Sequence, residues 1–298
     1  MQKILLICFL TTVLFSSLSS KTNSAVFLRI NPSARSIGMG GAGNAVFGDV
    51  SNIEINPAAL FWVKDAQLYF AHNKWFQGIS MSYIAYAKPI GNRRELVLAF
   101  SVRQLSPGSM DERDTEGIKQ GTFDGADTAY TVTLTKKLTS SIAAGITAKT
   151  ITQELYKESG SAYAADAGVL WSINRAWNLG ASIRNAGSDL KVYKTASPLP
   201  MTASLGLSYY NHGKYHLGLD MEKEINSEPI YRTGIEYFVS NNFDVRAGYS
   251  YTSDSYASDG YTLGLGFSTL YKLFIDYAFV PFGDLGDTHR ISLKYIFD

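Results

Sequence analysis

From about Gln67 to the end of the chain, apolar and polar residues alternate with a period of two. In "YTLGLGF", Tyr261, Leu263, Leu265 and Phe267 share one face, while a threonine and two glycines occupy the other. The stretches "YKLFIDYAF", "RISLKYIF" and "YHLGLDME" repeat this pattern. Alternation of this kind predicts β-strands that have one apolar and one polar face.

The pattern predicts about fourteen strands, most of them close to the length of a tilted strand that crosses a membrane. No convincing long helix interrupts them, so the predicted fold class is all-β. The predicted strands are 67–73, 78–88, 95–104, 127–138, 141–154, 161–173, 177–185, 200–210, 214–222, 229–239, 243–252, 260–268, 271–280 and 288–297.

The connections between these strands alternate in length. If the first strand runs outward from the periplasm, the even-numbered connections are short, as in "SNN" and "TLY", and the long ones, such as "SPGSMDERDTEGIKQGTFDGA", are odd-numbered. Outer-membrane barrels show this asymmetry, with an even strand count that leaves both termini periplasmic. We therefore predict a transmembrane antiparallel β-barrel over residues 66–298, embedded in the outer-membrane lipid of a Gram-negative-type bacterium.

The chemistry of the two strand faces assigns one to lipid and the other to the lumen. A charge that faces lipid at mid-depth costs ~2–4 kcal/mol for Arg or Lys, so the charged face points inward. Two interpretations of these charges stay open: a lattice of ion pairs that fills the lumen, or a polar path for a substrate. The predicted lumen charges are Arg103, Lys149, Asp166, Arg184, Asp220, Glu222, Arg232, Glu236, Arg246, Lys272, Asp276, Arg290 and Lys294.

The N-terminus has the pattern of a secretory signal peptide. A short basic start, "MQK", precedes the apolar stretch "ILLICFLTTVLF" and a small, polar segment. We predict a signal peptide over residues 1–24, cleaved between Ser19 and Ala25; a short membrane anchor is the alternative. Cys8 is the only cysteine, and Ile7 before it is not the small residue that a lipoprotein signal requires. The mature chain is therefore expected to lack disulfides and a thiol nucleophile.

Composition and the remaining chemistry argue against several classes of function. The 298 residues carry a net charge of +1, so no basic surplus indicates a nucleic-acid partner. His216 and Asp220 share a strand face, but four residues of strand separate them by ~13 Å, too far for direct contact. We find no nucleophile with a base in reach and no cluster of metal ligands, so we expect no enzyme activity, no metal and no cofactor.

Residues 25–65 do not alternate and are rich in Gly and Ala. In "GMGGAG", Gly38, Gly40 and Gly43 fit the G-x-G-x-x-G spacing of dinucleotide-binding turns. That motif requires a buried strand before it and a βαβ unit after it, and the chain offers neither. Together with Gly41, these glycines instead suit a compact plug whose backbone lies close to a barrel wall.

The same segment ends in a helix signal and two large aromatics. In "NPAAL", Asn56 suits the cap of a short helix and Pro57 its first position. A barrel of about fourteen strands encloses a lumen that something must fill, so we predict that residues 25–65 form a plug or hatch. The predicted plug and gating residues are Gly38, Gly40, Gly41, Gly43, Asn56, Pro57, Phe61 and Trp62.

The stretch "FLRINPSARSIGMGGAGNAVFGD…NPAAL", followed by a barrel-length run of alternating strands, resembles the PorV/PorQ family of outer-membrane proteins. More distantly, it resembles FadL-type fatty-acid transporters. Either resemblance implies a fourteen-stranded barrel with an N-terminal plug. The elements that carry it are Ala34–Arg35, Met39–Gly40–Gly41, Gly43, Ala45, Asp49 and Asn56–Pro57–Ala58.

The two resemblances imply different functions. A PorV/PorQ-type barrel is a non-enzymatic component of type IX secretion that binds or shuttles secreted cargo at the cell surface, with a translocon and cargo proteins as partners. A FadL-like barrel transports hydrophobic small molecules passively, with the plug gating a lateral exit. The stronger motif match favours secretion. Transport predicts a continuous apolar pocket beneath the plug, lined by Phe61, Trp62 and inward aromatics such as Tyr69, Tyr86 or Phe238.

Overall fold

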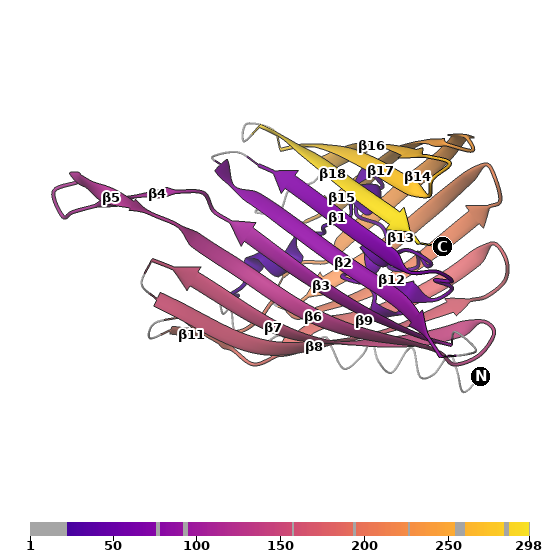
Figure 1. The fold of residues 1–298 in the computed structure, drawn as a ribbon, viewed down its shortest axis with the longest axis horizontal. Coiled ribbons are helices and arrows are strands. Elements are labelled where there is room, and N and C mark those ends of the chain that lie inside the picture. Colours follow the sequence, from indigo (N-terminus) through magenta and orange to yellow (C-terminus); the bar gives the residue numbers. More distant parts are fainter. Residues whose placement is uncertain are drawn as a thin grey trace.

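The computed structural model describes residues 23–297, apart from 76–77, 92–94, 157, 193–194, 226, 254–259 and 283–285. Within these residues, fourteen antiparallel strands form a closed barrel (Figure 1). The barrel closes where the first strand pairs with the last, from Gln67 opposite Ile296 to Lys74 opposite His289. The fold class that the sequence predicts is confirmed.

Each predicted strand has a counterpart, with bounds that differ by a few residues. The barrel strands are β1 (Gln67–Lys74), β2 (Ser80–Ile90), β3 (Leu96–Ser106), β6 (Gly125–Lys137), β7 (Ile142–Leu155), β8 (Glu158–Ser172), β9 (Trp177–Gly187), β12 (Thr202–Asn211), β13 (Tyr215–Glu224), β14 (Ile230–Ser240), β15 (Phe243–Thr252), β16 (Gly260–Ser268), β17 (Leu273–Pro281) and β18 (Asp287–Ile296).

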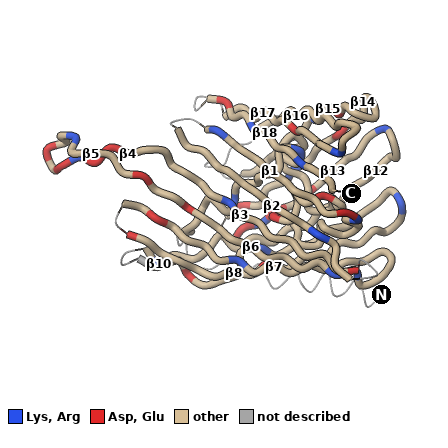
Figure 2. The backbone as a smooth tube through the Cα atoms, viewed as in Figure 1, with Lys and Arg blue, Asp and Glu red and all other residues tan. Residues whose placement is uncertain are grey.

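Two long connections contain small hairpins where the sequence predicts loops. One is β4 (Met110–Arg113) with β5 (Lys119–Phe123), and the other is β10 (Leu190–Val192) with β11 (Thr195–Ser197). The β4–β5 hairpin projects well beyond the barrel and carries charges of both signs (Figures 1 and 2). Both hairpins leave the same end of the barrel, here named the hairpin end. At the opposite, short-turn end, the connections span two to five residues.

Alternation places apolar side chains outside and polar ones inside. Along β1, Leu68 and Phe70 are exposed whereas Gln67, Tyr69, Ala71 and Asn73 are buried. Large exposed side chains on the other strands belong to the same outer face, as the lipid-facing surface of a membrane barrel requires. No described helix is long and apolar enough to span a membrane.

The segment before β1 lies inside the barrel as the predicted plug. It contains four short helical turns: η1 (Val26–Arg29), α2 (Ala34–Gly38), η2 (Val50–Asn52) and η3 (Pro57–Leu60). It begins at the hairpin end, where Asn23 and Arg29 both contact Glu224, the last residue of β13. It leaves at the short-turn end, where β1 starts. The segment therefore passes through the whole lumen.

This path changes one expectation about the termini. Gln67 and Ile296 do lie together at the short-turn end, as an even strand number requires. Residues 23–29, however, lie at the opposite end and not beside the C-terminal strand's end. Most of the predicted signal peptide, residues 1–22, lies outside the described residues.

Candidate functional site

Side-chain caps fix the short helices of the plug. Ser33 caps α2, and its Oγ accepts a hydrogen bond from the backbone N–H of Ser36 at 3.1 Å. Asn56 caps η3 by accepting from the N–H of Ala58 at 2.9 Å, with Pro57 at the first position, as the sequence predicts. The Asn56 amide also donates to the backbone carbonyl of Asn44 at 2.8 Å, which connects two turns of the plug. These bonds stabilise backbone that has no regular ladder.

Gly40 brings the plug backbone against the barrel wall. Its φ of 69° lies in the left-handed region, which glycine adopts without steric cost. Its N–H donates to Thr262 Oγ1 at 2.9 Å. A Cβ at this position would lie 2.6 Å from the carbonyl oxygen of Thr233, on β14. Only glycine fits here without displacing backbone.

Glycines on the inner face of the barrel wall lie against the plug, and we call this set the glycine belt. An added Cβ on any of its members would meet plug atoms at contact distance or closer, and most would collide with plug backbone or with the Asn56 side chain. Several members are direct cross-strand partners: Gly145 with Gly168, Gly180 with Gly206, and Gly218 with Gly234. The belt consists of Gly145, Gly168, Gly180, Gly206, Gly218, Gly234, Gly248 and Gly264.

Ion pairs connect α2 of the plug to β14–β17. Arg35 binds Glu236 through two hydrogen bonds, from Nε at 2.9 Å and from Nη2 at 2.6 Å. The same carboxylate accepts from Arg246 Nε at 2.7 Å, and Arg246 also reaches Asp276 at 2.7 Å. Glu236 has no exposed surface. Such a shared, buried carboxylate holds the plug helix and two wall strands together.

A second group of ion pairs surrounds Glu54 in the plug. Its Oε2 lies 2.8 Å from Arg103 Nη2 and 3.8 Å from Lys149 Nζ. Lys149 pairs in turn with Asp166 at 2.7 Å. On the adjacent wall, Arg184 and Arg232 both contact Glu222, at 2.7 and 3.5 Å.

Asp220 binds backbone N–H groups of the plug, whereas the carboxylates above bind charged side chains. It accepts hydrogen bonds from the backbone N–H groups of Gly43 and Asn44, at 2.7 and 2.8 Å. All ten predicted lumen charges discussed so far face inward. They are Arg103, Lys149, Asp166, Arg184, Asp220, Glu222, Arg232, Glu236, Arg246 and Asp276.

Of the other three predicted lumen charges, Arg290 and Lys294 are buried inside and Lys272 is not. Lys272 is exposed, in the turn between β16 and β17, because the strand begins at Leu273, two residues later than predicted. The ion pairs extend across the lumen and join the plug to several wall strands. This arrangement agrees with the interpretation in which charges fill the lumen.

Acid is expected to loosen the plug. Burial alone would raise the pKa of Asp49, but Lys294 at 2.6 Å and Arg35 at 3.2 Å outweigh it and hold that pKa well below its usual range. Burial likewise opposes the effect of Arg103 and Lys149 on Glu54, whose pKa is also lowered. A carboxyl with a lowered folded-state pKa stabilises the fold above its ordinary pKa of about 4, and this contribution is lost as the pH falls through the folded value.

We therefore expect the stabilisation that these two carboxylates supply to be constant from about pH 7 to 5, and the melting temperature to fall below about pH 4. Thermal unfolding in detergent micelles, followed by circular dichroism, measures it. Glu54→Gln should lower the melting temperature at pH 7 and reduce its loss in acid. Glu116→Gln, which removes a carboxylate from the exposed hairpin, is the matched control. An unchanged acid dependence in Glu54→Gln would contradict this role.

The predicted apolar pocket beneath the plug is present only in part. Phe61 is buried and stacks on Trp62 with ring centroids 4.2 Å apart. Both border a small cleft of about 160 Å³ at the short-turn end, together with Lys64, Glu95 and Lys137, so its lining is mixed rather than apolar.

None of the other three predicted pocket residues borders that cleft. Tyr69 is buried and packs edge-on to Tyr83. Phe238 faces inward but packs on Tyr210 near the short-turn end. Tyr86 faces outward and contacts Phe297, so its predicted inward orientation is wrong.

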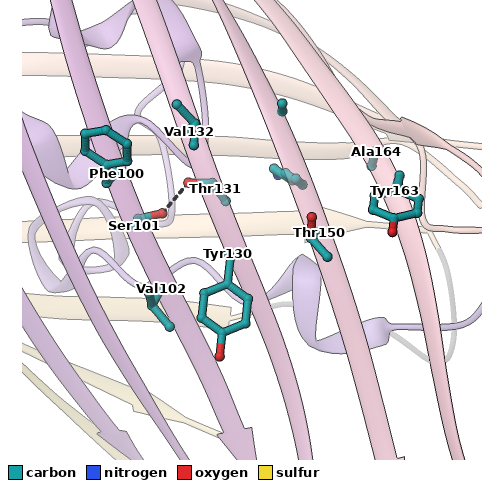
Figure 3. A pocket seen from close by; sticks show the side chains of 11 residues that line it. Phe100, Ser101, Val102, Tyr130, Thr131, Val132, Thr150, Tyr163 and Ala164 are labelled. Atoms are coloured by element: carbon teal, nitrogen blue, oxygen red, sulfur yellow. Dashed lines mark hydrogen bonds between the residues drawn. The ribbon is translucent and has the colours of Figure 1, made fainter.

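A larger depression of about 420 Å³ lies over the outer face of β3, β6, β7 and β8 (Figure 3). Cross-strand pairing explains it, because Thr150 on β7 lies between Tyr130 on β6 and Tyr163 on β8. Small side chains at Thr150 and Ala148 form the floor, and the aromatic rings form the rim. The depression is therefore apolar at its edges and faces the lipid side of the wall.

An apolar cluster lies on the inner face of the same strands. Phe27 and Leu28 of the plug pack there against Ile151 on β7 and Ala164 on β8, with further members on β6 and in the β9–β12 connection. Each strand contributes adjacent residues to the two faces, such as Thr150 outside and Ile151 inside. The wall is thus apolar on both sides around Ile151 and Ala164, next to the inward-facing ion pair of Lys149 with Asp166.

The pairing of β8 with β9 is irregular beside this region. Between Ala165 and Ala167 the register shifts, so that Asp166 faces both Arg184 and Asn185. Asn185 has a φ of 58°, and its N–H donates to Asp166 Oδ1 at 2.7 Å. This is a β-bulge, at which the ladder of the wall is locally interrupted.

Comparison with solved structures gives barrels of this architecture. The toluene transporter TodX from Pseudomonas putida has a TM-score of 0.67 at 12% identity, over 88% of this chain and 97% of that one. The toluene transporter TbuX from Ralstonia pickettii has a TM-score of 0.63 at 12% identity, over 90% and 98%. A FadL homologue from Pseudomonas aeruginosa has a TM-score of 0.58 at 15% identity, over 95% and 100%.

At these identities the likeness shows the fold: a FadL-like β-barrel. The neighbours are transporters and not enzymes. No protein-family model matches the sequence, and no curated protein matches it either. The PorV/PorQ resemblance and the role in type IX secretion that it implies receive no support from these comparisons.

Proposed function

We propose that this protein is an outer-membrane barrel that transports hydrophobic small molecules passively, by a route that leaves sideways through its wall. The observation that carries the proposal is a patch of the wall on β6, β7 and β8, around Ile151 and Ala164, that is apolar on both faces. Inside, Phe27 and Leu28 of the plug cover Ile151 and Ala164. Outside, the aromatic-rimmed depression lies directly behind them.

The state of the lumen argues for a sideways route. The plug backbone touches the glycine belt, and paired charges occupy the space around it. A solute that crossed the barrel lengthwise would have to break these contacts. An apolar solute that replaced Phe27 and Leu28 in the inner cluster would remain in apolar surroundings, and the bulge at Asp166 and Asn185 is the adjacent place where the wall ladder is already interrupted.

The fold comparisons agree with transport, since the neighbours described above are two toluene transporters and a FadL homologue. A role in secretion rests on the sequence resemblance alone. The feature that would suit it is the projecting β4–β5 hairpin, which offers a surface to a partner (Figure 1). Deleting that hairpin separates the two functions, because transport through β6–β8 does not require it.

Filling the outer depression is expected to slow uptake. In Thr150→Trp, an indole occupies the floor between Tyr130 and Tyr163 while the inner face is unchanged. We expect at least a fivefold lower rate of uptake of radiolabelled toluene by cells that depend on this barrel. Ala247→Trp is the matched control, because Ala247 also faces outward but lies on β15. Equal uptake by cells with and without the barrel, or an unaffected Thr150→Trp variant, would contradict the proposal.

A further inference from the structure

One buried cation of the lumen lacks the partner that the others have. Seven lumen cations each lie within 4 Å of a carboxylate: Arg35, Arg103, Lys149, Arg184, Arg232, Arg246 and Lys294. Arg290, on β18, is 5% exposed and has no such neighbour among the described residues. Its Nη1 donates to the backbone carbonyl of Asn31 in the plug at 3.2 Å, and its Nε has no hydrogen-bond partner.

The residues beside Arg290 are also unsatisfied. Asn73 is its direct cross-strand partner on β1, is 1% exposed, and has no partner for either its amide nitrogen or its oxygen. Ser292, two residues along β18 on the same face, is equally buried, beside the Tyr69 side chain, and its Oγ lacks a hydrogen bond of good geometry. Its direct partner on β17 is Asp276, whose carboxylate is already bound by Arg246. Buried polar groups in native proteins are nearly always hydrogen-bonded, and a buried cation without a counter-charge is costlier still.

Strand geometry brings these groups within reach of one ligand. Directly paired residues have Cβ atoms about 4.5–5.5 Å apart, and residues two apart on one strand are separated by about 7 Å. The guanidinium of Arg290, the amide N–H₂ of Asn73 and the hydroxyl of Ser292 can therefore donate to a single group. Trp75, whose ring centroid lies 5.5 Å from Arg290 Cζ, forms the border towards the hairpin end.

We propose that Arg290, Asn73 and Ser292 form a binding site for one oxyanion group, a carboxylate, in the lumen near the hairpin end. A carboxylate supplies the missing charge and accepts from all three donors, which water alone does only in part. The site lies on β1 and β18, apart from the apolar wall of β6–β8, and it does not depend on the transport route. The carboxylate belongs either to a small free acid or to the head of an amphiphile.

The test is equilibrium dialysis of the full chain in micelles of an uncharged detergent, against labelled acetate and labelled octanoate, with empty micelles subtracted. We expect saturable binding of a carboxylate that Arg290→Gln weakens at least tenfold. Arg175→Gln, which removes the same charge from an exposed turn at the other end, should leave it unchanged. Binding of both acids indicates a small free acid, and binding of octanoate alone indicates an amphiphile head.

A second variant guards against misfolding of Arg290→Gln. Asn73→Asp places a carboxylate opposite Arg290 and supplies the counter-charge from within the chain. It should raise the melting temperature and abolish binding of the added acid. No saturable binding to the wild-type chain, equal binding of 1-octanol and octanoate, or undiminished binding in Asn73→Asp would each overturn the proposal.

Discussion

A single methyl group at Gly248 is expected to displace the plug. In Gly248→Ala, the new Cβ would collide with the backbone of Met39 and Gly40, which, unlike a side chain, cannot rotate away. Overpacking of this kind costs about 1–3 kcal/mol, and here it acts on backbone held by the hydrogen bond to Thr262. We therefore expect a loss of about 3 kcal/mol in the free energy of unfolding.

Urea unfolding in lipid vesicles measures this loss, and limited proteolysis reports whether the plug leaves its seat. The control is Gly260→Ala, on the adjacent strand β16. Gly260 faces inward like Thr262 and Gly264. Among the described residues, however, an added Cβ there would have as a neighbour only the carbonyl oxygen of Pro281, 4.0 Å away. If the Gly248 and Gly260 variants behave alike, the plug is not held by close contact with the wall.

Removing the carboxylate of Glu236 is expected to have an equal or larger effect. Glu236→Leu leaves the guanidinium groups of Arg35 and Arg246 buried without their shared counter-charge. Breaking a buried ion pair by removing one partner costs about 3–5 kcal/mol when the remaining charge is uncompensated. Arg35 keeps Asp49 and Arg246 keeps Asp276 as partners, so the lower end of this range, about 3 kcal/mol, applies here. We expect a loss of that size in the free energy of unfolding, measured in the same way, and none in Glu116→Leu on the exposed hairpin.

A double variant tests whether the loss arises from the pairing itself. If Arg35 and Glu236 act as a unit, Arg35→Met combined with Glu236→Leu should cost clearly less than the sum of the two single changes. Additive losses would mean that Glu236 acts through packing and not through Arg35.

The barrel could be predicted from sequence because lipid outside and water or charge inside impose a strict period of two. Tyr261 to Phe267 alternate across all of β16, and a shift of one residue would expose every charge to lipid. The plug could be predicted because residues 25–65 lack this alternation of apolar and polar residues. The β4–β5 hairpin was missed because both its faces meet solvent, so nothing requires its residues to alternate.

The partners within the lumen could not be predicted in the same way. Strand alternation shows that Glu236 and Arg103 point inward, but it does not show which residues they contact. Arg35 and Glu236 are 201 residues apart in the sequence, and only the closed barrel brings them together. Strand alternation would have corrected the predicted orientation of Tyr86, because Tyr86 lies an odd number of residues from the inward-facing Tyr83 and therefore faces outward. The glycines on the polar faces of successive strands were a signal for the glycine belt, because a face that held only water would have no need for them.

The glycine belt has a consequence for how the chain assembles. On β7, β8, β9 and β12–β16, plug atoms lie so close to the wall glycines that an added Cβ would contact them, so little clearance remains for the plug to enter a barrel that is already closed. The plug precedes β1 in the chain, yet its partners on β14–β16 are synthesised long afterwards. We therefore expect the plug to lie between the strands that enclose it before the final pairing of β1 with β18 closes the barrel.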